Sequence, residues 1–161
     1  MMNSWLIDTN VLIYSYDQTS KFHKISYSLI EKAISGDINI FLSHQNLLEF
    51  TAVVTNSKRV ENSLPFEDVI QKLTIYLASF QLIYPRSETF ITFFKLLKFY
   101  PKLRERIFDL YLVATAFDND IYQICTWNIS DFKDIDQIIV KTPKELFEIP
   151  VSYTHLTLPT N

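Results

Sequence analysis

The segment that decides the fold lies near the N-terminus and reads Ser4-Trp5-Leu6-Ile7-Asp8-Thr9-Asn10-Val11-Leu12-Ile13. Its first four residues form a short apolar run that stops at a carboxylate, which is typical of a buried strand ending at a polar site. Asp8 or Thr9 can cap a helix that follows directly. The segment therefore predicts a strand, a polar turn that carries an acid, and a helix.

The alternation of apolar strands and helices continues along the chain. Further helices are expected over residues 22–34, from 43 to about 54, from 65 to about 77, over 87–100 and 104–117, and from 143. Ser43 and Ser63 are candidate N-caps, and Pro65 suits a first turn. Short apolar runs predict strands at 38–42, 82–84, 121–126 and 137–140. We therefore expect an α/β fold with three layers, α/β/α, around a mainly parallel sheet of four to five short strands.

Composition bounds the domain organisation and excludes several enzyme classes. The 161 residues are 48% hydrophobic and 20% charged, which suits one domain with a real core, assigned to residues 1–150. Residues 151–161 carry neither acid nor base and no periodicity, and we expect a non-native or disordered tail there. Gly36 is the only glycine, so the glycine-rich phosphate loops and the G-x-S-x-G elbow of hydrolases are absent.

The cysteine, histidine and charge content bear on zinc binding, on the cellular compartment and on nucleic-acid binding. The single cysteine, Cys125, cannot form an intrachain disulfide, and the three histidines lack the spacing of zinc ligands. The N-terminus does not resemble a signal peptide and no apolar run reaches 18 residues, so we expect a cytoplasmic protein outside the membrane. A net charge of −3 argues against a globally basic nucleic-acid coat and leaves room for a local basic groove.

Three acids stand in apolar helical contexts that follow strand-like segments: Asp8, Glu49 and Asp109. Each alone has an ordinary explanation as a helix cap, a solvated residue or a partner of a helix N-terminus. Two carboxylates about 5 Å apart at an effective dielectric near 20 repel by roughly 3 kcal/mol, so three at one site need a cation. Oxygen ligands suit Mg²⁺ or Mn²⁺. The joint pattern therefore predicts a divalent metal site.

Four motifs, in this order, resemble those of the PIN domain family, in particular the toxin nucleases of VapBC-type toxin–antitoxin pairs. They are Leu6 to Ile13, Ser43-His44-Gln45-Asn46-Leu47-Leu48-Glu49-Phe50, the segment Asp109-Leu110-Tyr111-Leu112-Val113-Ala114-Thr115-Ala116, and Thr126-Trp127-Asn128 followed by Asp131-Phe132. The resemblance covers about residues 3 to 148. It implies a PIN-like fold and a metal-dependent endoribonuclease, the toxin of a pair, with RNA as substrate, a cognate antitoxin as partner and a homodimeric assembly.

The resemblance also implies roles for individual acids. Asp8 and Asp109 would be the main ligands of Mg²⁺ or Mn²⁺, and Glu49 would complete the acidic pocket directly or through water. The metal would polarise the phosphoryl oxygen and lower the pKa of an attacking water.

Other polar residues of the motifs are assigned supporting roles by the same resemblance. Thr9, Asn10 and Thr126 would orient the carboxylates or the scissile phosphate by hydrogen bonds. Asn128 stands where many family members carry a fourth carboxylate, and it could hold a metal-bound water but cannot act as a base. Asp131 either compensates for this substitution or caps the following turn, and we expect the cap.

Two other functions fit parts of the sequence. A catalytically inactive PIN scaffold that binds RNA or a protein is supported only by the substitution at Asn128. A haloacid-dehalogenase-like phosphatase also places an aspartate after its first strand, as at Asp8, but it needs a second aspartate two residues later, where this chain has Asn10.

A basic run precedes Asp109, within twelve positions: Lys95, Lys98, Lys102, Arg104 and Arg106. It is either a solvated surface or a phosphate-binding rim that leads to the acids.

The same region holds more apolar side chains than one helix face can bury: Ile91, Phe93, Phe94, Leu97, Phe99 and Tyr100. We expect most of them in the core, with Phe99 and Tyr100 packed there rather than stacked on a base. Any surplus would form an interface with a second copy of the chain or with an antitoxin peptide.

Overall fold

The computed structural model describes residues 4–103 and 105–148 of the chain. The expected tail at 151–161 and one of the basic residues, Arg104, lie outside the described residues. The elements in chain order are β1 (Trp5–Ile7), α1 (Thr9–Tyr16), α2 (His23–Ile34), β2 (Ile40–Ser43), α3 (His44–Val54), α4 (Phe66–Ser79), β3 (Gln81–Ile83), α5 (Thr89–Phe99), η1 (Pro101–Leu103), α6 (Ile107–Asp118), β4 (Gln123–Cys125), η2 (Ile129–Asp131), β5 (Ile139–Lys141) and α7 (Pro143–Phe147).

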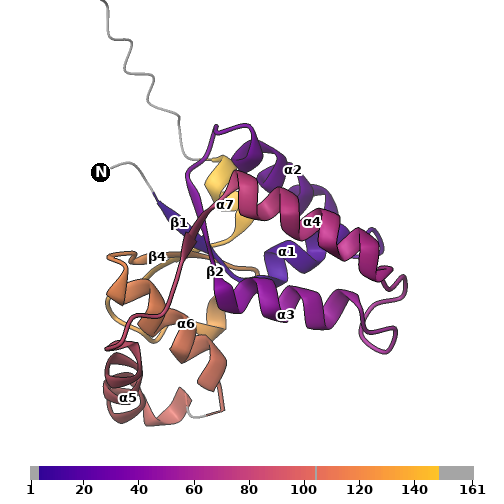
Figure 1. Cartoon of the computed structure of the whole chain (residues 1–161). Coiled ribbons are helices and arrows are strands. Elements are labelled where there is room, and N and C mark those ends of the chain that lie inside the picture. The colour runs from indigo at the N-terminus through magenta and orange to yellow at the C-terminus, as the bar shows by residue number, and fades with distance from the viewer. Residues whose placement is uncertain (1–3, 104, 149–161) are drawn as a thin grey trace, which may run out of the picture.

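The strands form one five-stranded parallel sheet in the order β3-β2-β1-β4-β5. β1 lies at the centre, where Leu6 pairs with Phe41 of β2 and with Ile124 of β4. α5 and α6 cover one face of the sheet, and α1, α2, α3, α4 and α7 cover the other (Figure 1). The expected three-layer α/β/α fold with a parallel sheet is therefore confirmed.

Two hydrophobic clusters fill the space between the layers, one on each face of the sheet. Successive side chains of β1 point into the two clusters in turn. Trp5 and Ile7 belong to the cluster beneath α1 to α4, and Leu6 belongs to the cluster beneath α5 and α6. This alternation follows from the two-residue period of a strand. All three side chains are buried, which explains why β1 reads as a continuous apolar run.

Several boundaries differ from those that the sequence predicts. Pro65 itself occupies the N-cap position of α4, so Ser63 does not cap this helix. The helix expected from residue 104 begins at Ile107, after the short helix η1. In the described part of the chain, no helix is long and apolar enough to cross a membrane.

The apolar segment of α5 is far more exposed than expected. Phe93 and Leu96 are buried, but Phe94 is 51% exposed and Phe99 is 79% exposed. The expectation that Phe99 belongs to the core is therefore wrong, whereas Tyr100 is half-buried and packs against the core as expected. Ile91 is exposed like Phe94, so the core takes up only part of this segment. α5 lies in an outer layer and packs chiefly against α6, so only one of its faces meets the core.

Candidate active site

Asp8 follows β1 directly and serves as the N-cap of α1. Its Oδ1 accepts a hydrogen bond from the Thr9 backbone N–H at 2.7 Å. Its Oδ2 accepts hydrogen bonds from Asn10 Nδ2 at 2.9 Å and from the Thr126 hydroxyl at 2.8 Å. The carboxylate is buried, and these three donors fix its orientation.

Thr126 connects Asp8 to the loop that follows β4. Its hydroxyl accepts hydrogen bonds from Asn10 Nδ2 at 3.0 Å and from the Asn128 backbone N–H at 3.0 Å. The Trp127 backbone N–H donates to Asn10 Oδ1 at 3.3 Å. β1 and β4 are adjacent and parallel, so their carboxyl ends place these residues together although they are far apart in sequence.

Glu49 lies on α3, one turn beyond the start of the helix. The helix begins with a capping box between Ser43 and Asn46, which confirms Ser43 as the N-cap. The Thr9 hydroxyl donates to Glu49 Oε2 at 2.6 Å and accepts from Asn46 Nδ2 at 3.2 Å. Gln45 Nε2 donates to Glu49 Oε1 at 2.8 Å. Both carboxylate oxygens are therefore engaged by neighbouring side chains.

Asp109 lies in the first turn of α6 and is half-buried. No hydrogen bond to its side chain is found among the described residues. Arg106, at the N-cap position of α6, pairs with Asp131 at 3.3 Å and donates to the Ser130 carbonyl oxygen at 2.7 Å. The acids Asp109, Asp131 and Glu49 are close enough to interact electrostatically, with Arg106 between them as the opposing charge.

The electrostatics of the site destabilise negative charge. Burial raises the pKa of Asp8 to about 7, and repulsion from Asp109 and Glu49 adds to the rise against the hydrogen bond from Thr126. Burial likewise raises the pKa of Asp109 to about 6, aided by Asp131 and Glu49 and opposed by Arg106. A cation that binds near a carboxylate with a raised pKa stabilises the ionised form of that carboxylate.

The donor chemistry of these acids fits a hard divalent cation, since carboxylate oxygens are the ligands that Mg²⁺ and Mn²⁺ prefer. Among the residues that the structure describes, no three His, Cys, Asp or Glu side chains are gathered tightly enough to hold an ion as they stand. Glu49 is instead held by Thr9 and Gln45. The shared metal site of Asp8, Glu49 and Asp109 thus stays a prediction.

The sequence model of the PIN domain matches residues 5–137, which include β1 to β4, helices of both layers and all the acids described above. The chain belongs to the PIN domain family. Its match with a curated relative, Ribonuclease VapC37 of Mycobacterium tuberculosis, is 31% identical over 74 residues, or 46% of this chain. That match spans about half of the relative's length, 51%.

Two solved structures share the architecture of this PIN domain. VapBC2 from Rickettsia felis, bound to a DNA fragment from its promoter, matches with a TM-score of 0.62 and 21% identity over 86% of this chain and 98% of that one. VapBC-1 from nontypeable Haemophilus influenzae matches with a TM-score of 0.62 and 16% identity over 88% and 98%. Because the sequence identities are this low, the similarity to these two structures establishes a shared fold and nothing about activity.

The other two predicted site residues, Asn128 and Asp131, make no side-chain hydrogen bond to Asp8 or Glu49 among the described residues. The Asn128 side chain is exposed, and its backbone N–H rather than its amide joins the network. Asp131 ends the short helix η2, and its carboxylate pairs with Arg106. The structure therefore gives Asp131 an ion pair beside Asp109 instead of the expected cap.

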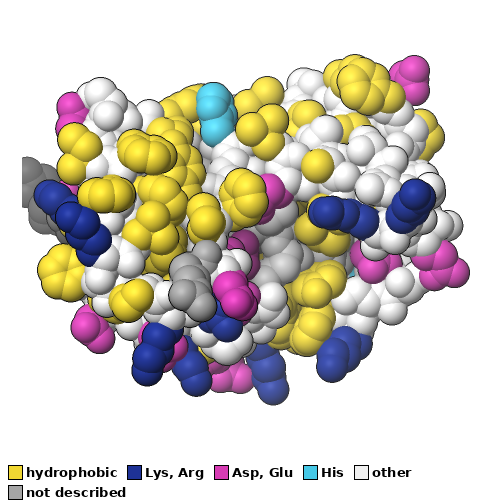
Figure 2. All heavy atoms as spheres, turned by 90° about the horizontal axis from the view of Figure 1, so that it is seen from below, with side chains coloured by type: hydrophobic (Ala, Val, Ile, Leu, Met, Phe, Trp, Pro, Cys, Tyr) yellow, Lys and Arg dark blue, Asp and Glu magenta, His cyan; other side chains and the backbone are white. Residues whose placement is uncertain are grey.

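The basic residues are divided between the site and the open surface. Lys95, Lys98 and Lys102 are exposed, and Lys98 lies over the ring of Phe94 at 4.7 Å. Among the described members of this group, Arg106 is the one that interacts with the acids. Figure 2 shows acidic side chains in a hollow near the middle of one face, hydrophobic side chains gathered to the left of it, and Lys and Arg along the lower edge.

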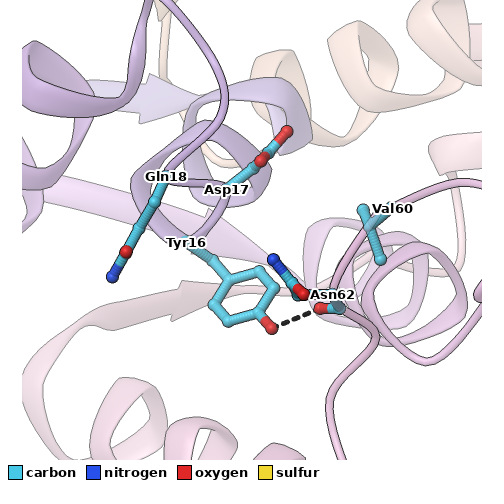
Figure 3. Close-up of a pocket in the computed structure, with 5 residues that line it drawn as sticks. All are labelled: Tyr16, Asp17, Gln18, Val60 and Asn62. Atoms are coloured by element: carbon cyan, nitrogen blue, oxygen red, sulfur yellow. Dashed lines mark hydrogen bonds between the residues drawn. The ribbon is translucent and has the colours of Figure 1, made fainter.

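A separate pocket of about 190 Å³ lies at the far end of α1 and contains none of the predicted site residues. It is lined by Tyr16, Asp17, Gln18, Val60 and Asn62 (Figure 3). The Tyr16 hydroxyl donates to the Asn62 backbone oxygen across it. This pocket thus belongs to the packing of the loop before α4 and not to the acids.

Sequence reasoning missed three residues that shape the site: Gln45, Asn46 and Arg106 in its contact with Asp131. A signal existed for Asn46, because it stands three residues after the N-cap Ser43, where a capping box places its second member. Gln45 and Arg106 contact residues that are 63 and 24 positions away, so no local pattern indicates their roles.

Proposed function

We propose that this PIN domain is a divalent-metal-dependent endoribonuclease that hydrolyses phosphodiester bonds in RNA. The observation that carries the proposal is that Asp8, Glu49 and Asp109, from the end of β1, from α3 and from the start of α6, lie close enough to repel one another electrostatically. Burial and mutual repulsion raise the pKa of two of them, which is the electrostatic state that a bound cation relieves. The partial match to a ribonuclease supports the same reaction.

Asp8 and Asp109 would hold Mg²⁺ or Mn²⁺, with Glu49 acting directly or through water. When bound, such a cation neutralises charge on the scissile phosphate and lowers the pKa of an attacking water. The chain's own residues supply orientation: Asn10 and Thr126 fix the Asp8 carboxylate.

Glu49 is oriented by Thr9, whose hydroxyl is itself set by Asn46. Asn128, exposed beside this network, would donate an amide hydrogen to a phosphate oxygen, and it has no group that could act as a base.

We further propose that the enzyme is the toxin of a toxin–antitoxin pair, acts in the cytoplasm and assembles as a homodimer. Its fold is that of proteins solved as VapBC complexes, which supports a small protein antitoxin as partner. The exposed apolar side chains of α5, including Phe94 and Phe99, offer surface for either assembly. The exposed Lys95, Lys98 and Lys102 would attract the RNA backbone toward this side of the molecule.

The decisive experiment compares wild type and Asp8→Asn on single-stranded RNA with and without Mg²⁺ or Mn²⁺. We expect cleavage that requires the metal and falls at least about 100-fold in Asp8→Asn, since metal-assisted stabilisation of a transition state is worth several kcal/mol. Asp37→Asn, which removes an exposed acid shortly before the amino end of β2, is the matched control and should cleave normally. RNA binding without metal-dependent cleavage would instead establish the inactive scaffold.

A further inference from the structure

Gln45 on α3 joins two parts of the candidate site. Its Nε2 donates to Glu49 Oε1 at 2.8 Å and to the Phe108 carbonyl oxygen at 2.8 Å. Glu49 lies four residues later on the same helix, where side chains meet. Phe108 lies in the first turn of α6 and directly precedes Asp109. One amide group therefore links the carboxylate of α3 to the backbone that carries the Asp109 carboxylate.

The orientation of the Gln45 amide follows from its partners. A carboxylate and a carbonyl oxygen both accept, so the amide nitrogen faces them and the oxygen faces away. Gln45 Oε1 is buried and has no hydrogen-bond partner within the described residues. A buried acceptor without a donor reduces stability, so a side chain of the same size without polar atoms would serve the fold at least as well. The favourable polar contacts of Gln45 are therefore those that its nitrogen makes to Glu49 and Phe108.

The start of α6 depends on such outside contacts. Arg106 occupies its N-cap position but makes no side-chain cap, and its guanidinium reaches Ser130 and Asp131 of η2 instead. Gln45 holds the following turn from the side of α3. Between them, these two side chains tie the segment 106–109 to η2 and to α3. The separation of Glu49 and Asp109 is therefore set in part by Gln45.

We propose that Gln45 is a positioning residue for the divalent cation: it holds Glu49 and Asp109 at the separation that joint binding of the ion requires. This inference rests on the proposed metal-dependent function. Removal of a residue that orients a metal ligand typically lowers metal affinity or activity by roughly 10–100-fold. Gln45 touches neither substrate nor metal in this role and acts through the two acids.

The test measures Mn²⁺ binding to the full chain by isothermal titration calorimetry, with thermal melting of the metal-free protein beside it. In Gln45→Met, which keeps the size and helix propensity of the side chain, we expect Mn²⁺ affinity to fall about 10- to 100-fold. The metal-free melting temperature should not fall, because the buried unsatisfied oxygen is removed and water can reach both former partners, Phe108 being 72% exposed. On RNA at saturating metal, kcat should fall while KM stays within about twofold.

Two further variants keep the outcome interpretable. Gln71→Met makes the same change on an exposed position of α4 and should leave Mn²⁺ affinity unaltered. Gln45→Asn retains an amide that is one methylene too short to reach both acceptors, so it should also lose affinity, and it carries the test if Gln45→Met does not fold. Equal Mn²⁺ affinity in wild type and both Gln45 variants would overturn the inference and leave the nuclease proposal standing. A wild type that neither binds Mn²⁺ nor cleaves RNA would overturn both.

Discussion

Asp8 and Asp109 lie on two sides of the same candidate site, and the protein holds them by different means. Asp8 is buried at the end of a central strand, and three donors from its own motif and from Thr126 bond its two oxygens. Asp109 is half-buried at the start of an outer helix and lacks such donors among the described residues. Its surroundings are set by Arg106, Asp131 and Glu49 through charge.

This difference indicates a division of labour between a rigid side and an adjustable side. Every donor to Asp8 makes a further hydrogen bond or belongs to the start of α1. A movement of that carboxylate would therefore disturb the residues at the carboxyl ends of β1 and β4. The position of Asp109 can change with the side chains that hold the first turn of α6. Substitutions on the Asp8 side should therefore lower both the free energy of unfolding and the activity. Substitutions on the Asp109 side should change the activity with little change in the free energy of unfolding.

The largest effect is expected for Thr126→Val, which attacks the rigid side. The variant removes one donor to Asp8 and leaves Asn10 Nδ2 and the Asn128 N–H without their shared acceptor. We expect a loss of about 1–3 kcal/mol in the free energy of unfolding, measured by urea denaturation.

Mn²⁺ affinity should fall in the same variant by at least about tenfold, measured by calorimetry. Thr115→Val is the control, because the hydroxyl of this buried threonine donates to the Tyr111 carbonyl oxygen of its own helix, and it should bind Mn²⁺ normally. Normal Mn²⁺ affinity in Thr126→Val would contradict the claim that the donors to Asp8 fix this carboxylate for metal binding.

The next effect concerns pH and requires no mutation. The pKa of Asp8 is raised to about 7 and that of Asp109 to about 6, both from 3.8. Between the unfolded and folded values the folded protein binds more protons than the unfolded chain, so its stability falls as pH rises. The melting temperature of the metal-free protein should therefore decrease from about pH 4 to about pH 7.

The same acids predict that a cation reverses this decrease. Saturation a hundredfold above Kd is worth about 2.7 kcal/mol, so Mn²⁺ should raise the melting temperature most above about pH 7, where both acids are ionised. In Asp8→Asn the decrease with pH should be smaller, because the group with the larger shift is removed. A melting temperature that rises with pH, or that is insensitive to Mn²⁺, would argue against a shared acidic site.

The smallest effect is expected for Arg106→Met, which attacks the adjustable side. The Arg106–Asp131 pair is partly exposed, so its loss should change the free energy of unfolding by less than about 1 kcal/mol. The pKa of Asp109 should rise further, because Arg106 is the charge that opposes the rise. The pH profile of cleavage should therefore shift upward, whereas Lys133→Met, at an exposed site nearby, should leave it in place. A stability loss like that of Thr126→Val would abolish the distinction between the two sides.

The Asp8 side was predictable from sequence because its contacts lie within short motifs at strand ends. Asp8, Thr9 and Asn10 are consecutive, and Thr126 ends the run of an adjacent parallel strand, so the fold class alone brings them together. The alternation of strands and helices likewise predicted the three layers, since it follows from the periods of the two elements.

The Asp109 side was less predictable because it depends on contacts between distant residues and on helix boundaries. The first turn of α6 begins three residues later than periodicity indicates, which moves Arg106 to the cap position. Gln45 resembles any solvated helix residue until its partner Phe108 is known. Phe99 is apolar, yet an outer helix has one buried face, and hydrophobicity alone does not say which residues fall outside it.

The central place of β1 in the sheet has a consequence for how the protein comes into being on the ribosome. β1 is made first, but its partner β4 is made more than a hundred residues later, and the bond from Thr126 to Asp8 spans 118 positions. A contact of such sequence separation carries a large entropic cost of loop closure, which slows folding. A nascent chain that ends before α6 would carry the first two acids without the third and without the hydroxyl that orients Asp8. The chain must therefore be synthesised beyond Thr126 before the acids can act together with an oriented Asp8.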